Sequence, residues 1–336
     1  MRAAVITAPG AVAIETVPDP APAPGEVVIA VLAAGVCGTD LHILAGEFAP
    51  RLPIIPGHEL SGEVVAVGSE IGSEGDRLRV GDRVVVDPSL PCHGCHYCRR
   101  GRVNLCERFA AIGVTRAGGA AEYAVVPVQN CIRLPEGMDP VHAALTEPVA
   151  CAVNAFDSLP RRPGEHYLLY GAGTMGLIMA RLALRSGAAG LWMVDPRSER
   201  REVAQAMRLP AVAPGDSAIE ARKRGHDVVI DCTGVLAAIG DGLPRVAPGG
   251  TFLHLGVPPE GARVDYDAHR VYRHEITITG TMSVQHSMER AADLLADDLI
   301  DAEVMVSARF ELADYPSALD SVRSGDGIKS MVLPQE

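Results

Sequence analysis

The sequence contains no long uninterrupted apolar run and no block of five or more like charges. The first absence argues against a membrane-spanning helix, which needs about 20 predominantly apolar residues in a row. The second absence, together with a formal net charge of −12, argues against a nucleic-acid partner, because an acidic protein repels a polyphosphate backbone. No internal repeat and no low-complexity tail is present.

The chain also lacks an N-terminal apolar stretch long enough for a signal peptide, since residues 1–6 lead directly into Pro9-Gly10. We therefore expect a cytoplasmic protein. Its 336 residues predict two domains, and its eight cysteines indicate metal ligands and buried thiols rather than disulfides.

The first third of the chain has the short apolar runs and Gly/Pro punctuation of β-strands. Runs at residues 27–32, 62–68 and 81–86 predict antiparallel barrel strands, with a polar loop at residues 68–76 between the last two. Cys37 and His58-Glu59 lie next to such strands, so loops on a β scaffold are expected to carry the first candidate site.

The residue types around Gly57-His58-Glu59 are those of an open zinc site. Cys37, His58, Glu59 and Glu147 offer one thiolate, one imidazole and two carboxylates, and catalytic zinc uses such ligands while keeping a position for water or substrate. Glu147-Pro148 interrupts an Ala-rich helical pattern near residues 141–156, where an unpaired carboxylate is costly. Taken singly, Cys37 and His58 are more typical of a core than of a metal site, and Glu147 is more typical of a helix surface.

A second metal signal is Cys92-x2-Cys95-x2-Cys98-x7-Cys106, in a segment rich in Gly, His and Arg. Four thiolates at this spacing predict a closed structural zinc that orders a lobe with little core. An iron–sulfur cluster is disfavoured, because the ferredoxin pattern has a closer fourth cysteine followed by Pro. Redox thiols remain an alternative. His93 and His96 are either solvated loop residues or substitute ligands.

From residue 166 the pattern changes to strand, glycine-rich turn and helix. The turn contains Gly171, Gly173 and Gly176 with Thr174 and Met175, and Asp195 ends the next strand. This arrangement predicts a dinucleotide site, with the pyrophosphate at the helix N-terminus and Asp195 on a ribose hydroxyl. A carboxylate there favours NAD over NADP, although Arg197, Arg200 and Arg201 close behind leave NADP open.

Strands and helices then alternate, which predicts a doubly wound parallel sheet in an α/β fold. Thr233-Gly234 and Gly256-Val257 follow its strands and are candidate ligand contacts. A last helix at residues 287–299 and strands near 305–306 and 328–333 are expected to return to the first domain. The predicted domains are residues 1–153 with 284–336, including a zinc lobe at about 90–107, and residues 154–283.

Together these residues resemble the zinc-dependent medium-chain dehydrogenase/reductase (alcohol dehydrogenase) family over essentially the whole chain. The resemblance implies a GroES-like catalytic domain and a Rossmann domain, a nicotinamide cofactor that also contacts Arg200, and two zinc ions. It implies that Cys37, His58 and either Glu59 or Glu147 hold a catalytic zinc, with the other carboxylate nearby as an exchangeable ligand. It assigns Cys92, Cys95, Cys98 and Cys106 to a structural zinc. It also implies a homodimer or homotetramer.

The branch of this family is less closely defined. Glu147-Pro148 resembles the polyol (sorbitol/xylitol) dehydrogenases, whereas the Cys-Gly-Thr-Asp-x-His block at residues 37–42 also resembles threonine dehydrogenase. Ile43 and Ser283-Val284 stand where sorbitol dehydrogenases carry a Tyr and an Arg-Tyr pair. We therefore expect oxidation of a polyol, sugar alcohol or cyclitol, with a threonine-type or simple secondary alcohol dehydrogenase as the alternative. A zinc-free quinone or enoyl reductase and a zinc-ribbon binding protein are remote alternatives.

The resemblance also implies a mechanism. Zinc lowers the pKa of the bound substrate alcohol, and hydride passes from its carbon to the nicotinamide. We expect the proton to leave through the Thr39 hydroxyl, the cofactor ribose and His42. Without the neighbouring Cys37, a loop cap at Thr39 and a surface histidine at His42 would be favoured over a proton relay.

Overall fold

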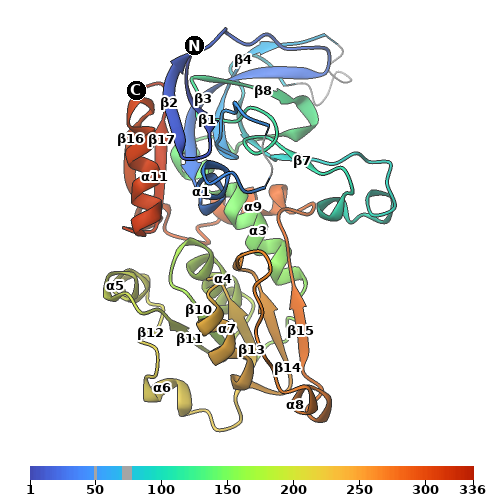
Figure 1. The fold of residues 1–336 in the computed structure, drawn as a ribbon, viewed down its shortest axis with the longest axis vertical. Helices are drawn as coiled ribbons and strands as arrows, with labels where there is room; N and C mark the ends of the chain where they lie inside the picture. Colours follow the sequence, from blue (N-terminus) through green and yellow to red (C-terminus); the bar gives the residue numbers. More distant parts are fainter. Residues whose placement is uncertain (49–50, 70–77) are drawn as a thin grey trace. The chain divides into compact units, whose positions relative to one another are not determined.

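The computed structural model describes residues 1–48, 51–69 and 78–336, so most of the predicted loop at residues 68–76 lies outside the described residues. The chain forms two compact units (Figure 1). Unit 1 comprises Met1–Ala150, Val284–Asp298 and Ala302–Glu336, and unit 2 comprises Cys151–Ser283 and Leu299–Asp301. None of the helices in the described ranges has the length and apolarity needed to cross a membrane.

Unit 1 is built mainly on antiparallel strands. Its strands are β1 (Arg2–Ala8), β2 (Ala11–Thr16), β3 (Glu26–Val36), β4 (Glu59–Val67), β5 (Arg83–Val86), β6 (Ser89–Leu90), β7 (Ala110–Ala111), β8 (Tyr123–Pro127), β9 (Cys131–Arg133), β16 (Val306–Glu311) and β17 (Lys329–Leu333). The main sheet has the order β16-β17-β3-β4-β5-β9, and β8 also pairs with β3. Its helices are α1 (Gly38–Leu44), α2 (Pro140–Ala143), α9 (Met288–Ala296), α10 (Ala302–Met305) and α11 (Tyr315–Ser324), whereas α3 (Thr146–Asp157) begins in unit 1 and ends in unit 2.

Among the apolar clusters in the described part of unit 1, one is built on β3 and another on α1. In β3, Val27, Ile29 and Val31 face one cluster, as expected for a strand whose side chains alternate between faces. A second cluster packs Ile43 and Leu44 of α1 against Tyr315 of α11. Each such buried aliphatic side chain contributes about 1.5–3 kcal/mol. The second cluster therefore fixes α1, the helix that carries Thr39 and His42.

Unit 2 is a six-stranded parallel sheet with helices. Its strands are β10 (His166–Tyr170), β11 (Gly190–Val194), β12 (Ala211–Val212), β13 (His226–Asp231), β14 (Val246–His254) and β15 (Thr277–Gly280). Its helices are α4 (Thr174–Arg185), α5 (Ser198–Ala206), α6 (Ser217–Glu220), α7 (Leu236–Gly242) and α8 (Ala268–Arg273). The strand order is β12-β11-β10-β13-β14-β15, which is the Rossmann order with its switch point between β10 and β13. The predicted doubly wound parallel sheet is confirmed.

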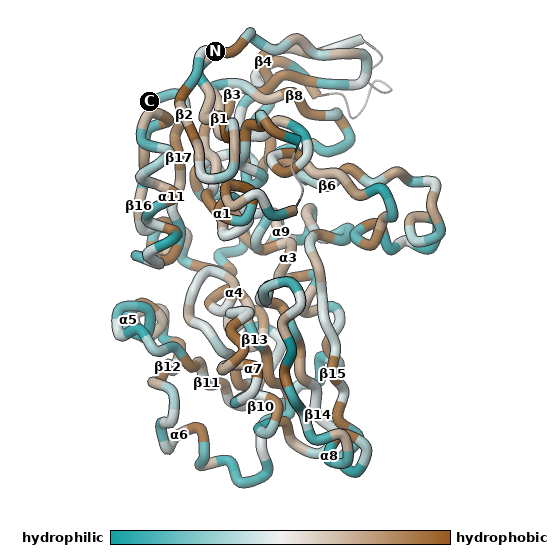
Figure 2. Tube along the Cα trace, in the orientation of Figure 1, coloured by the Kyte–Doolittle hydropathy of each residue, from teal (hydrophilic) through white to brown (hydrophobic). Residues whose placement is uncertain are grey.

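Hydropathy explains why these segments become central strands. Val228, Val229 and Ile230 in β13 are fully buried, and this strand is hydrophobic in colour whereas α5 is hydrophilic (Figure 2). A continuous apolar run is the pattern of a parallel strand that is covered on both faces.

Two predicted details differ from the structure. The helical pattern near residues 141–156 forms two helices, α2 and α3, and the break between them precedes Glu147. Pro148 lies in the first turn of α3, where the N–H that proline lacks has no helical partner. In addition, α11 follows the helix that was expected to be the last one, and it packs against β17 (Figure 1).

Candidate active site and metal centres

Unit 1 brings Cys37, His58 and Glu59 together. Cys37 follows the last residue of β3, Glu59 is the first residue of β4, and Gly35 of β3 lies opposite Glu59 in the antiparallel pair. The ligand atoms of Cys37, His58 and Glu59 all lie within 4.8 Å of one another. His58 and Glu59 are buried and Cys37 is half-buried. This mixed set of sulfur, nitrogen and oxygen donors fits zinc.

The buried carboxylate of Asp40 lies beside this group, a position that the sequence did not predict. Asp40 accepts hydrogen bonds from the Cys37 N–H at 2.8 Å and the Gly57 N–H at 3.3 Å, and it lies 3.9 Å from Nδ1 of His58. The contact is too long for a hydrogen bond, and Nδ1 of His58 has no hydrogen-bond partner among the described residues, so Asp40 acts on the ring through its charge. Asp40 can do this because α1 begins directly after Cys37, which brings residue 40 back toward the Cys37 backbone.

The electrostatics of this group favour a cation. Burial alone would lower the pKa of His58, but the hydrogen bond with Cys37 and the charges of Asp40, Cys37 and Glu147 raise that pKa to about 10. The surroundings therefore hold a positive charge on His58 when no metal is present. A divalent cation can replace that proton, because a histidine ligand must be neutral.

Glu59 has a second cationic neighbour, Lys329 of β17, which the sequence analysis also missed. The two side chains form an ion pair, and both are almost completely buried. Burial lowers the pKa of Lys329, but the charges of Glu59, Cys37 and Glu147 raise it above its ordinary value. Gly35 makes this pair possible, since a Cβ there would lie 2.1 Å from Oε2 of Glu59.

Glu147 lies near this group but outside its tight cluster. It is buried near the start of α3, and its charge acts on both His58 and Lys329. Among the described residues, the cluster of ligand atoms within 4.8 Å contains Glu59 and not Glu147.

The two residues expected to carry the proton lie on α1. The Oγ1 atom of Thr39 is 3.9 Å from the sulfur of Cys37, and Nδ1 of His42 is 2.5 Å from Oε2 of Glu47. Residues three apart on a helix share a face, so Thr39 and His42 line one side of this helix. Ile43, which stands where sorbitol dehydrogenases carry Tyr, is fully buried in the core.

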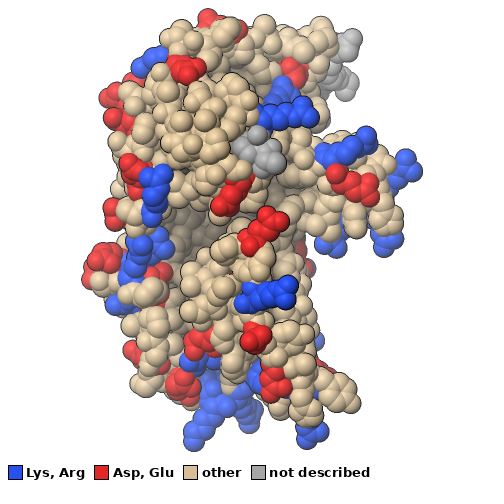
Figure 3. Space-filling model, viewed as in Figure 1, with Lys and Arg blue, Asp and Glu red and all other residues tan. Residues whose placement is uncertain are grey.

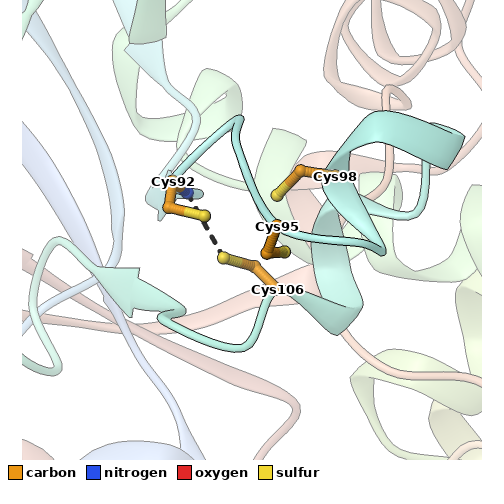
Figure 4. A group of neighbouring side chains, drawn as sticks. All are labelled: Cys92, Cys95, Cys98 and Cys106. Carbon is orange, nitrogen blue, oxygen red and sulfur yellow. Dashed lines mark hydrogen bonds between the residues drawn. The ribbon is translucent and has the colours of Figure 1, made fainter.

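The four clustered cysteines converge on one point in the lobe between β6 and β7 (Figure 4). Their sulfur atoms all lie within 4.8 Å of one another, against about 3.8 Å for a tetrahedron with zinc–sulfur bonds of about 2.3 Å. The sulfur of Cys106 accepts N–H groups of Cys92 and Arg108, each at 3.3 Å. Hydrogen bonds from the Gly94 N–H and the Arg108 side chain lower the pKa of Cys92 to about 5. This set fits a closed four-thiolate site.

In unit 2 the glycine-rich turn joins β10 to α4, and Thr174 and Met175 are the first two residues of that helix. Gly171 has φ +97°, and a Cβ at Gly176 would lie 1.9 Å from the Gly171 carbonyl oxygen. A side chain at either position would distort the turn. The turn therefore presents backbone N–H groups at a helix N-terminus, which is the arrangement that binds a pyrophosphate.

Asp195 lies directly behind this turn and is 3% exposed. One carboxylate oxygen accepts the Ala172 N–H at 2.8 Å and the other accepts the Arg197 N–H at 2.9 Å. The guanidinium of Arg200 lies next to Gly173, since a Cβ there would be 3.4 Å from Nη1. Arg201 donates to the backbone carbonyls of Asp195 and Pro196, each at 2.8 Å. The structure thus brings Asp195 and Arg200 to the dinucleotide turn.

The other predicted cofactor residues also converge. A Cβ at Gly234 would lie 2.3 Å from the Val257 carbonyl oxygen, and one at Gly256 would lie 2.1 Å from the Gly234 nitrogen. Asp231, another residue that the sequence analysis missed, accepts hydrogen bonds from the Thr233 N–H, the Thr233 hydroxyl and the Gly234 N–H. It fixes the end of β13 beside the switch point.

Two family models match two different parts of the chain. Residues 23–136 match the alcohol dehydrogenase GroES-like domain, and residues 174–297 match the zinc-binding dehydrogenase family. The chain is 35% identical to D-arabinitol dehydrogenase 1 of Uromyces fabae, over 92% of this chain and 90% of that protein. It is 36% identical to D-altritol 5-dehydrogenase of Agrobacterium fabrum, over 87% of each. A zinc-binding dehydrogenase of Sinorhizobium meliloti 1021, solved with NADP bound, matches with a TM-score of 0.93 and 32% identity, over 99% of each chain.

The chain therefore belongs to the zinc-binding dehydrogenase family, as an alcohol dehydrogenase of the medium-chain type. It is an oxidoreductase that acts on CH–OH groups with a nicotinamide cofactor. The predicted combination of a GroES-like part with a Rossmann part is confirmed.

Proposed function

We propose that this enzyme oxidises a secondary alcohol group of a polyol or sugar alcohol, with NAD as the preferred cofactor, and reduces the corresponding ketone in reverse. The observation that carries the proposal is the buried group of Cys37, His58 and Glu59, whose ligand atoms lie within 4.8 Å of one another. The polyol class is supported by the relatives that are named for D-arabinitol and D-altritol.

Two zinc ions per chain are part of this proposal. Cys37, His58 and Glu59 hold the catalytic ion, Glu147 is the exchangeable carboxylate nearby, and Cys92, Cys95, Cys98 and Cys106 hold the structural ion. When bound, the catalytic zinc supplies a Lewis acid that makes an alcohol hydroxyl acidic near neutral pH. The charge of Asp40, 3.9 Å from Nδ1 of His58, favours a cation at this ring, either a proton or the metal that replaces it.

Thr39 and His42 transfer the proton of the substrate hydroxyl to solvent. Oγ1 of Thr39, 3.9 Å from the sulfur of Cys37, takes up the proton of the substrate hydroxyl and gives its own proton to the cofactor ribose, from which it passes to His42. His42 lies one turn further along α1 and is partly exposed, so its ring releases the proton to solvent.

For the cofactor, we propose that Gly171, Gly173 and Gly176, with Thr174 and Met175, bind the pyrophosphate of NAD. Asp195 and Arg200 contact the adenosine half, and Thr233, Gly234, Gly256 and Val257 contact the remainder. The buried carboxylate of Asp195 repels a 2′-phosphate, which supports NAD. The Sinorhizobium meliloti protein was solved with NADP, so NADP is the cofactor to compare with NAD.

The experiment is a substrate panel. Zinc-loaded enzyme is assayed with NAD and with NADP against polyols, cyclitols, simple secondary alcohols and L-threonine, by the absorbance of the reduced cofactor. We expect the highest kcat/KM with a polyol and NAD. His58→Ala should lose the catalytic zinc and turnover while remaining folded. Turnover by a His58→Ala enzyme that lacks this zinc would contradict the mechanism, and exclusive activity on threonine would contradict the substrate class.

A further inference from the structure

The C-terminus of α1 places a carboxylate on the ring of His42. The helix is closed by Gly46, whose φ is +83°. The Gly46 N–H donates to the Ile43 carbonyl at 3.0 Å, and the Glu47 N–H donates to the His42 carbonyl at 2.8 Å. These are the two bonds of a Schellman cap, which positions the residue after the glycine over the last helical turn. Glu47 is therefore fixed above His42 by the backbone.

The side chains of Glu47 and His42 are also in contact. Oε2 of Glu47 lies 2.5 Å from Nδ1 of His42, and the Phe48 ring packs on the same imidazole with a centroid distance of 5.1 Å. The turn between β1 and β2 braces the cap, because the Gly10 N–H donates to the Leu44 carbonyl at 2.6 Å. The imidazole thus has one nitrogen occupied and one face covered.

An ion pair at this position contributes little to stability. The Glu47 side chain is 60% exposed and that of His42 is 34% exposed, and solvent screens the attraction within an exposed pair of this kind. The contact does determine the tautomer, however. An ionised carboxylate only accepts hydrogen bonds, so Nδ1 of His42 must carry the hydrogen, and the lone pair of the neutral ring is then on Nε2.

We propose that Glu47 is the positioning residue of the proton relay: it holds Nδ1 of His42 as a donor, so that Nε2 takes up the substrate proton and releases it to solvent. This inference rests on the proposed role of His42. In the step, the proton binds to Nε2 while Nδ1 keeps its hydrogen bond to Glu47, and the proton then leaves Nε2 for water. Glu47 itself touches neither substrate nor cofactor.

The test compares Glu47→Ala and Glu47→Gln, with and without His42→Ala, on the zinc-loaded enzyme with NAD and its best substrate. We expect Glu47→Ala to lower kcat about three- to tenfold and to leave KM within about twofold of wild type. The loss in kcat is smaller than the full contribution of a general acid–base group, because His42 itself is still present. The amide oxygen of Glu47→Gln still accepts from Nδ1, so its kcat should stay within about twofold of wild type. Glu15→Ala, an exposed glutamate on β2, is the matched control.

Two further readouts separate positioning from a structural effect. In the His42→Ala background, Glu47→Ala should cause no additional loss, because it acts only through the ring. Nitrogen-15 spectra of the His42 side chain should report hydrogen on Nδ1 in wild type and in Glu47→Gln, and a mixture of tautomers in Glu47→Ala. Independent losses in the double variant, or an unchanged tautomer in Glu47→Ala, would overturn the inference. Full turnover by His42→Ala alone would instead overturn the proposed relay.

Discussion

Glu59 stands between two sources of positive charge, the metal that its cluster fits and the ammonium group of Lys329. Both side chains of the Glu59–Lys329 pair are almost completely shielded from solvent. Desolvating two charges is expensive, so a buried pair of this kind adds little net stability, whereas removing one partner leaves the other charge unbalanced. The change in the free energy of unfolding on losing Lys329 should therefore depend on whether zinc is bound.

This dependence can be tested with Lys329→Met. In metal-free protein we expect a loss of about 3–5 kcal/mol in the free energy of unfolding, because Glu59 is left buried without a cation. With zinc bound, the metal provides the missing charge, and the loss should be distinctly smaller. Urea unfolding with and without zinc measures both values, and Lys329→Arg, which keeps the charge, is the control. An equal loss in the two states would show that Lys329 contributes by packing alone.

The candidate site also shows what could be predicted at the level of residues. Cys37, His58 and the four clustered cysteines could be proposed as ligands because zinc selects few residue types, and the cysteines are also closely spaced. Asp40 and Lys329 were missed for different reasons. Asp40 lies within the Cys-Gly-Thr-Asp-x-His block, but its carboxylate reaches the Cys37 backbone only when α1 has formed. Lys329 is 270 residues beyond Glu59, and strand register alone brings the two together.

At the scale of elements, the cysteine lobe has little apolar core of its own. Apart from two of its cysteines, Val103 is its only buried hydrophobic residue among the described positions from 92 to 106. Basic side chains gather on its surface (Figure 3), and Arg99, Arg100 and Arg102 are exposed. The proposed zinc therefore has to supply the stability that packing does not, since structural zinc contributes directly to folding.

Cys106→Ser tests this dependence. We expect it to release about one zinc per chain and to make the lobe sensitive to trypsin at Arg99, Arg100 and Arg102, because the segment is no longer tied together. Metal analysis and mass spectrometry of the tryptic fragments provide the measurement. Cys131→Ser on β9 is the matched control, since Cys131 belongs to neither cysteine-containing cluster. Full metal content and trypsin resistance in Cys106→Ser would refute the structural zinc.

The elements themselves were predictable to different degrees. The unit 2 strands β10, β11, β13 and β14 were predicted because each is a short apolar run next to a turn, and the parallel sheet followed from their alternation with helices. Helix α11 was missed, although Tyr315, Ala318 and Leu319 are buried at helical spacing and Gly325 ends the helix with φ +72°. Its apolar residues are too few for composition alone to distinguish it from a loop, and contact with β17 makes it a helix of the core.

At the scale of the whole molecule, the candidate metal ligands and the candidate cofactor contacts belong to different units. Both clusters of metal-type ligands lie in unit 1, and the glycine-rich turn with Asp195 and Arg200 lies in unit 2. Unit 2 has its own apolar core, in which Leu168, Val229 and Phe252 are fully buried. A unit that supplies its own core and its own ligand contacts can keep its binding function when the other unit changes.

Removal of zinc by a chelator should therefore abolish turnover but leave binding of the reduced cofactor within about threefold of its original affinity, a difference of less than 1 kcal/mol. Fluorescence titration with NADH on metal-free and zinc-loaded protein measures this, and Gly171→Val, which cannot adopt the turn, is the control that should lose binding in both states. A loss of NADH affinity greater than about tenfold on chelation would mean that the dinucleotide contacts of unit 2 do not suffice, and that cofactor binding depends on a unit 1 stabilised by its metals.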